Sequence, residues 1–420
     1  MIYSKPLAYD SLKSVLLRME ANFRINLSLR IPGIRTAEKS MPLYVEFLQM
    51  TPNGTDINSL EYMVHCVQPN PLILSDWQED IVPEEVKTGF GSDLTRFGIR
   101  DFSVDDEILP GDVVLPEAEI VNMGRRMLEL NLQELDEMMT LRMDDLTESP
   151  GTHLVFKILN SSRLVSMEHL DYSRSLAQAA KYMNEKLLGG RRRAIRVERF
   201  HDGYGVLRLP VGLTLKTKES SIRRSIEELC DSYQGILLDE SFPQKCIAFI
   251  GDSDDFIFHE VYQHPHAQSA GHLQFECKEP NENWLDAILG VKNSEGHFEC
   301  GIHHEVIFSA LDFWIGNGWE IGRDWSFGIE KEEDVRKLLD ACQAWRGLMV
   351  DQIPNLGCIT FPDVFTIPLK NATEMSIYCK DNYGRKYFEE YCRWELNIVV
   401  TSKDHRHLWN VDFDKDVVLL

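Results

Sequence analysis

Long apolar runs, a leader-like N-terminus and regularly paired cysteines are all missing from this sequence of 420 residues. No apolar run approaches the roughly 20 residues that a membrane-spanning helix needs. The first ten residues, MIYSKPLAYD, contain no apolar core of the signal-peptide kind. The nine cysteines are odd in number and irregularly spaced, which favours reduced thiols over a disulfide framework. We therefore expect an intracellular protein, cytoplasmic or nuclear, with no membrane partner.

The sequence also lacks an excess of basic charge. It has 44 lysines and arginines against 67 aspartates and glutamates, for a net charge of −23. Such a chain repels nucleic acid and anionic lipid surfaces, so neither is an expected partner. A hydrophobic content of 43% with 26% charged residues is typical of a globular protein, and the length predicts two or three domains.

Motifs for cofactor binding and catalysis are missing as well. Gly316, Gly318 and Gly322 are one residue too widely spaced for a dinucleotide fingerprint, and they follow a predicted helix instead of a strand. There is no P-loop and no nucleophile elbow. The sequence predicts no cofactor and no catalytic residue, although an enzyme without a recognisable motif remains an alternative.

One histidine-rich stretch has the residue types of a metal site. His297, Cys300, His303 and His304 lie within eight residues. A structural zinc site needs four ligands in defined pairs, and this spacing matches none of the common patterns. We predict no bound metal, and a metal-binding protein is kept as an alternative together with the undetected enzyme.

The N-terminal stretch of residues 6–43 has a helical pattern in a chain that otherwise alternates strands and helices. The first predicted helix has apolar residues at helical spacing: Leu12, Val15, Leu16 and Met19. A second begins at Asn22, directs Phe23 and Leu27 inward and ends at Pro32. A third turn covers residues 34–39. Helices of about ten residues are unstable alone in water, so all three need a packing partner.

Charge distinguishes the same stretch from the rest of the chain. The first 40 residues contain seven basic and three acidic residues, while the whole chain is strongly acidic. This contrast suggests an acidic protein partner for the helices. A basic face that contacts only solvent is the alternative.

The middle of the chain predicts a mixed α+β region. Residues 44–48 and 62–64 resemble the strands of a hairpin around a turn at Pro52-Asn53-Gly54. One long amphipathic helix is expected at about residues 116–147, and a shorter helix ends at Gly189-Gly190. Four arginines follow within six residues and suit either a phosphate, an acidic peptide or a solvated loop: Arg191, Arg192, Arg193 and Arg196.

The C-terminal half has a loose repeat. Phe249, Phe275, Phe298 and Phe327 each lie in a short predicted strand, with helical segments between them. Strand–helix units of this length are typical of a curved, leucine-rich-repeat-like solenoid whose concave strand face would hold a partner. Residues 365–367, 376–378 and 394–399 are expected to form closing strands.

Several motifs carry a resemblance to a known family. The N-terminal pattern of Pro6-Leu7, Leu12, Val15-Leu16, Met19, Arg24, Leu27 and Arg30 resembles a degenerate F-box. EKSMPLYVEFLQMTPNGTDIN, PGDVVL, LGGRRRAIRVERF, NENWLDAIL and WIGNGWEIGRDWSFG resemble the F-box C proteins expanded in nematodes, with their associated domain of unknown function. The resemblance implies a Skp-type adaptor of a cullin ubiquitin ligase and an unidentified protein substrate as partners. The adaptor contacts it implies are Pro6, Leu7, Leu12, Leu16, Met19 and Leu27.

These observations predict a non-catalytic interaction protein of α+β or α/β class. The expected parts are a helical headpiece at residues 1–42, a mixed domain at 43–220 and a repeat-like domain at 221–420. The main alternative is a protein-binding module whose F-box remnant engages no adaptor. Arg30-Ile31-Pro32 favours it, because an F-box usually has a tryptophan shortly after its second helix.

Overall fold

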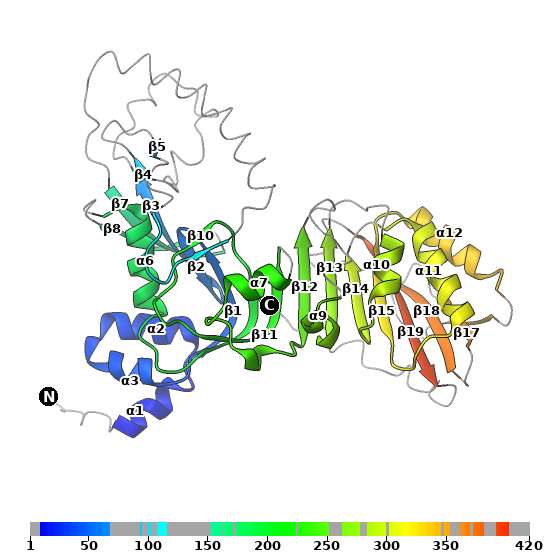
Figure 1. Cartoon of the computed structure of the whole chain (residues 1–420), viewed down its shortest axis with the longest axis horizontal. Coiled ribbons are helices and arrows are strands. Elements are labelled where there is room, and N and C mark those ends of the chain that lie inside the picture. The colour runs from blue at the N-terminus through cyan, green and yellow to red at the C-terminus, as the bar shows by residue number, and fades with distance from the viewer. Residues whose placement is uncertain are drawn as a thin grey trace, which may run out of the picture. The chain divides into compact units, whose positions relative to one another are not determined.

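The chain forms two compact units in a computed structural model (Figure 1). One contains Met1–Arg223 with Glu227–Ser241, and the other contains Arg224–Ile226 with Phe242–Leu420. The structure describes residues 9–67, 93–94, 100–101, 107–115, 153–161, 163–170, 174–223, 226–251, 263–277, 284–299, 302–345, 348–352, 361, 363–369, 373–381 and 392–402. The long helix predicted at residues 116–147 lies outside these ranges. None of the helices in them has both the length and the apolar character needed to cross a bilayer.

The first unit is built on a mixed sheet with the strand order β11-β9-β1-β2-β3-β7-β8. Its strands are β1 (Tyr44–Thr51), β2 (Gly54–Ile57), β3 (Leu60–Val67), β7 (His153–Asn160), β8 (Arg163–Leu170), β9 (Ile195–His201) and β11 (Leu215–Ile222). Strand β9 runs parallel to both β1 and β11, and the remaining pairs are antiparallel. The predicted turn at Pro52-Asn53-Gly54 is confirmed, because it joins β1 to β2. Two short pairs accompany the sheet: β4 (Asp93–Leu94) with β5 (Arg100–Asp101), and β6 (Val113–Val114) with β10 (Val206–Leu207).

Among the described residues, the first unit has four helices that the sequence predicted and one, at residues 226–232, that it did not. They are α1 (Tyr9–Leu16), α2 (Ala21–Arg30), α3 (Arg35–Ser40), α6 (Leu176–Leu187) and α7 (Ile226–Ser232), with 3-10 turns at Pro32–Ile34 and Asp239–Ser241. The Ser175 side chain caps α6 by accepting a hydrogen bond from the Gln178 amide. The helix stops before Gly190, whose φ of +69° suits glycine. Thr55 of β2 donates a hydrogen bond to Asn184 of α6 at 2.6 Å, which ties the helix to the sheet.

The second unit alternates strands and helices before it ends in antiparallel strands (Figure 1). In chain order it has β12 (Cys246–Gly251), α9 (Pro265–Ser269), β13 (His272–Cys277), α10 (Trp284–Gly290), β14 (Glu295–Glu299), α11 (His304–Asn317), β15 (Asp324–Ile329), α12 (Glu332–Cys342), β16 (Met349–Gln352), β17 (Asp363–Pro368), β18 (Thr373–Asp381) and β19 (Trp394–Ser402). Strands β12 to β15 are parallel neighbours. Strand β19 then pairs antiparallel with β15, followed outward by β18, β17 and β16.

The phenylalanine spacing of the repeat corresponds to the register of the parallel strands. Phe249, Phe275, Phe298 and Phe327 are register partners on adjacent strands, and all four are fully buried. Their rings stack with centroid distances of 5.3, 4.7 and 5.4 Å. Trp284 of α10 packs edge-on against this row, 5.6 Å from Phe298. The helices therefore cover the phenylalanine face of the sheet.

The expectation of a leucine-rich-repeat solenoid is not supported. Its strand–helix alternation is present, but the same sheet continues into four antiparallel strands, so the fold is mixed α/β. The spacing of the phenylalanines reflects the length of one strand–helix unit. The spacing does not indicate which strand pairs with β15 on the side away from β14, and in the structure that strand is β19.

Candidate protein-docking site

Buried charges join the N-terminal helices α2 and α3 to each other and to the rest of the first unit. Glu38 of α3 accepts a hydrogen bond from Arg24 of α2 at 3.0 Å, and the Arg191 guanidinium lies 2.9 Å from the same carboxylate oxygen. The three side chains are 0%, 1% and 4% exposed, respectively. Arg24 also donates to the backbone carbonyls of Pro42 and Met41. One carboxylate thus joins α2, α3 and the loop after α6.

Burial determines the protonation behaviour of this cluster. Desolvation lowers the pKa of Arg24 and of Arg191, and the nearby Glu38 carboxylate opposes the shift in both cases. Lys39, from α3, donates to the carbonyls of Lys186 and Leu187 at 3.0 Å and so caps the end of α6. Burial, with repulsion from Arg191, lowers its pKa to about 7. Two of the seven basic residues among the first 40, Arg24 and Lys39, therefore point into the protein instead of forming a basic surface.

Helix α2 carries an exposed apolar stripe, defined here as Phe23, Leu27 and Ile31. These residues recur every four positions, so they lie along one side of the helix, with Ile31 as its C-terminal cap. Phe23 is 60% exposed and Ile31 is 47% exposed, while Leu27 is half-buried. Val15 and Leu17, at the end of α1, are also exposed. Exposed apolar side chains that lie next to one another, unlike single ones, are a feature of contact surfaces.

The residues predicted to contact an adaptor fall into three groups. Leu16 is fully buried and belongs to the core. Leu12, Met19 and Leu27 are half-buried. Pro6 and Leu7 lie outside the described residues. The inward position predicted for Phe23 is wrong, because Asn22 takes the inward side of α2, bonding the Ile57 carbonyl and the Tyr62 hydroxyl.

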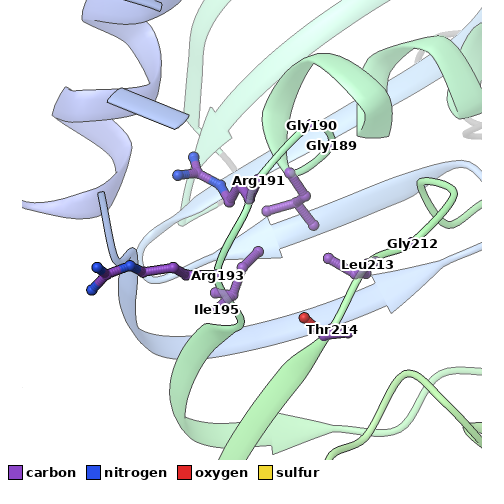
Figure 2. Close-up of a pocket in the computed structure, with 9 residues that line it drawn as sticks. Gly189, Gly190, Arg191, Arg193, Ile195, Gly212, Leu213 and Thr214 are labelled. Atoms are coloured by element: carbon purple, nitrogen blue, oxygen red, sulfur yellow. The ribbon is translucent and has the colours of Figure 1, made fainter. Parts of the chain in front are cut away.

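The arginine-rich loop does not form a converging anion site. Arg191 points inward to Glu38, whereas Arg192, Arg193 and Arg196 are exposed. A shallow hollow lies between residues 188–195 and 212–214. Figure 2 shows that Arg191 and Arg193 extend from the loop away from the Gly212–Thr214 side of this hollow. Arg196 instead packs over the Tyr44 ring, 5.3 Å from its centroid.

The second unit has a polar row on the face of its sheet opposite the phenylalanines. Gln274, His297, Ser326 and Asn397 are successive register partners on β13, β14, β15 and β19. His297 Nδ1 lies 2.6 Å from the Ser326 hydroxyl. Asn397 is buried and the other three are half-buried. This row occupies the place where a solenoid would present its concave strand face.

Three of the described thiols are poorly suited to nucleophilic catalysis. Burial raises the pKa of both Cys342 and Cys392 to about 12, and it also raises the pKa of Cys230. A thiol reacts as its thiolate, so such groups are inert at neutral pH. The cysteines found as free thiols are Cys66, Cys230, Cys246, Cys342, Cys379 and Cys392.

Comparison with known families assigns one segment of the chain. Residues 175–331 match the family described as Domain of unknown function (DUF3557). The matched segment runs from the cap of α6 to just after β15, so it includes the arginine-rich loop and all four parallel strands of the second unit. It covers less than half of the chain and excludes α1, α2 and α3. Neither the curated proteins nor the solved structures contain a significant match.

Sequence reasoning identified the N-terminal helices but missed Glu38 as their anchor. No local pattern distinguishes Glu38 from an exposed glutamate, because its two arginine partners come from α2 and from the loop after α6.

Proposed function

We propose that this protein is a non-catalytic recruiting subunit, in which α1–α3 dock on a Skp-type adaptor of a cullin ubiquitin ligase. The observation that carries the proposal is the exposed apolar stripe of α2. The F-box resemblance of the same segment suggests the identity of the partner. The rest of the chain would bind a protein substrate and hold it near the ligase, which raises its effective concentration there.

The rigid attachment of α2 supports a docking role. A contact surface loses less entropy on binding when its helix is already ordered. Arg24 and Asn22 hold α2 from its inward side, through Glu38 and Ile57, which leaves Phe23 and Ile31 directed to solvent. The stripe is therefore presented by the folded protein and needs no rearrangement to be reached.

The second unit is the proposed substrate-binding part. Its polar row of Gln274, His297, Ser326 and Asn397 lies opposite the helix-covered face, and hydrogen-bonding side chains in that position suit an extended polypeptide. The free thiols agree with a reducing intracellular compartment, cytoplasm or nucleus.

The rival proposal is a protein-binding module that engages no adaptor. It is favoured by the inward positions of Arg24 and Lys39, which weaken the positive field that would attract an acidic partner. The sequence Arg30-Ile31-Pro32 also favours this rival, because the F-box pattern has a tryptophan shortly after its second helix and this chain has none there.

A binding experiment with matched variants distinguishes the two. The purified chain is titrated with a purified Skp-type adaptor, and affinity is compared with that of Phe23→Ala and Leu16→Ala. Truncation of an exposed anchor costs about 2 kcal/mol or more in binding, so Phe23→Ala should weaken the complex at least about 30-fold with an unchanged melting temperature. Leu16→Ala should lower the melting temperature, because the residue is fully buried.

Tyr182→Ala is the control, because Tyr182 is a 48% exposed aromatic residue on α6 of the same unit. Its adaptor affinity should equal that of the unmodified chain. Absence of binding by the folded, unmodified chain would exclude the adaptor and favour the rival. Equal losses in Phe23→Ala and Tyr182→Ala would place the contact elsewhere.

A further inference from the structure

A cluster of metal-ligating side chains lies where α11 and α12 begin. His303 directly precedes α11, His304 and Glu305 are the first two residues of that helix, and Asp334 is the third residue of α12. Strands β14 and β15 are parallel, so the helices that follow them start at the same edge of the sheet. That topology brings Asp334 to the two histidines although it is distant from them in sequence.

The separations within the cluster suit a single small cation. The ligand atoms of His303, His304 and Glu305 all lie within 4.8 Å of one another. His304 Nδ1 is 3.1 Å from Asp334 Oδ1, and His303 Nδ1 is 3.8 Å from Glu305 Oε2. Ligands at about 2.0–2.1 Å from a tetrahedral zinc ion are about 3.4 Å apart. Asp334 lies outside the group of three and is near His304 alone of them, so a four-ligand set needs side-chain rotation that turns Asp334 and the group toward one ion.

An unsatisfied buried atom points to the same site. His304 Nδ1 is inaccessible to solvent and makes no hydrogen bond to the described residues, although the Asp334 carboxylate is within reach. Buried polar atoms are nearly always paired, so this nitrogen needs an explanation. The ring nitrogen and the carboxylate are close to each other but are not aligned for a hydrogen bond. Two ligands of one metal ion have the same arrangement.

The surrounding charges permit a cation. The positive end of the α11 helix dipole disfavours a bound cation, and the negative charges of Glu305 and Asp334 offset that effect. Lys337 Nζ lies 3.6 Å from Asp334, but its closer partner is Glu333 at 3.0 Å. Lys337 can thus remain paired with Glu333 while Asp334 binds an ion.

We propose that His303, His304, Glu305 and Asp334 form a binding site for a divalent transition metal of the zinc type. Two imidazoles with two carboxylates suit zinc, whereas magnesium and calcium prefer all-oxygen sites. With four protein ligands the site is closed, and its role is structural, joining the first turn of α12 to that of α11. This ligand set shares His303 and His304 with the histidine-rich stretch noted in the sequence. It leaves out His297, which is hydrogen-bonded to Ser326, and Cys300, which lies outside the described residues.

Calorimetric titration of the full, metal-stripped chain with zinc chloride tests the proposal. The unmodified chain should bind zinc saturably and unfold at a higher temperature when zinc is present. Asp334→Asn and His304→Gln preserve side-chain size, and each should weaken zinc binding by at least about 100-fold. Substitution of a residue that only hydrogen-bonds to a metal ligand already lowers metal affinity by about 10–100-fold. Circular dichroism checks that both variants are folded.

His272→Gln is the matched control, because His272 also lies near a carboxylate, 3.7 Å from Glu295, on the same unit. It should bind zinc as the unmodified chain does. Cobalt titration adds a readout that excludes the cysteines, because thiolate ligands give a charge-transfer absorption and a site of imidazoles and carboxylates does not. The proposal is overturned by an absence of saturable zinc binding, by unchanged affinity in Asp334→Asn and His304→Gln, or by a thiolate spectrum.

Discussion

Replacement of Glu38 by glutamine tests the anchoring of the N-terminal helices. The substitution keeps the size of the side chain and removes its negative charge from between two buried guanidinium groups. Arg24 keeps its bonds to backbone carbonyls, including that of Pro42. The Arg191 guanidinium lies 2.9 Å from the Glu38 carboxylate, whose negative charge favours the charged form of this buried arginine.

The structure sets the expected magnitude. Removal of one partner from a buried ion pair costs about 3–5 kcal/mol, because the remaining charge is left uncompensated. We expect about 3 kcal/mol for Glu38→Gln, at the lower end, since Arg24 stays hydrogen-bonded. That is a change of about 100-fold in the unfolding equilibrium. Adding Arg191→Met should recover at least about 1 kcal/mol, because it removes the unpaired charge.

The two units can be followed separately during urea unfolding. Seven of the eight tryptophans lie between residues 284 and 409, so tryptophan fluorescence reports mainly on the second unit. Glu38→Gln should lower the urea concentration at the midpoint of the transition seen by far-ultraviolet circular dichroism. The midpoint of the fluorescence transition should not change. Glu198→Gln is the control, because Glu198 pairs with Lys218 at the surface and its loss should cost under about 1 kcal/mol. A loss below about 1 kcal/mol in Glu38→Gln, or no recovery in the double variant, would refute the reasoning.

Two further predictions concern the sheets. Asp56 faces Glu61 across the β2–β3 pair, and burial, followed by repulsion from Glu61, raises its pKa to about 6. The folded chain then holds a proton that the unfolded chain releases, so Asp56 lowers stability as pH rises from 3.8 to about 6. Asp56→Asn should remove that dependence and stabilise the protein by about 1 kcal/mol at pH 7, which urea titrations at several pH values can check. Phe298→Ala should lower the stability of the second unit by about 3–5 kcal/mol. The Phe298 ring stacks on Phe275 and Phe327, with centroid distances of 4.7 and 5.4 Å. A loss of less than about 1 kcal/mol, measured from the fluorescence transition, would contradict this packing.

Local signals in the sequence predicted much of the secondary structure. The Pro52-Asn53-Gly54 turn, the end of α6 before Gly190 and the alternation of strands and helices after Cys246 all depend on residues close together in the chain. Hydrophobic spacing also located the phenylalanine row, because each strand–helix unit returns the chain to the next strand after a similar length. The predicted site residues were less reliable. Leu16 proved to be core and Arg191 proved to be an anchor.

The sequence by itself determined the short N-terminal helices, the strand–helix alternation and the strongly acidic character of the chain, since periodicity, turn residues and composition are local or summed properties. Only the tertiary structure decided that Phe23 faces solvent, that Glu38 balances Arg191 and that Asp334 meets His304. Burial and charge pairing depend on which distant segments pack together, and in this protein parallel strand pairing and the packing of α3 bring those segments into contact.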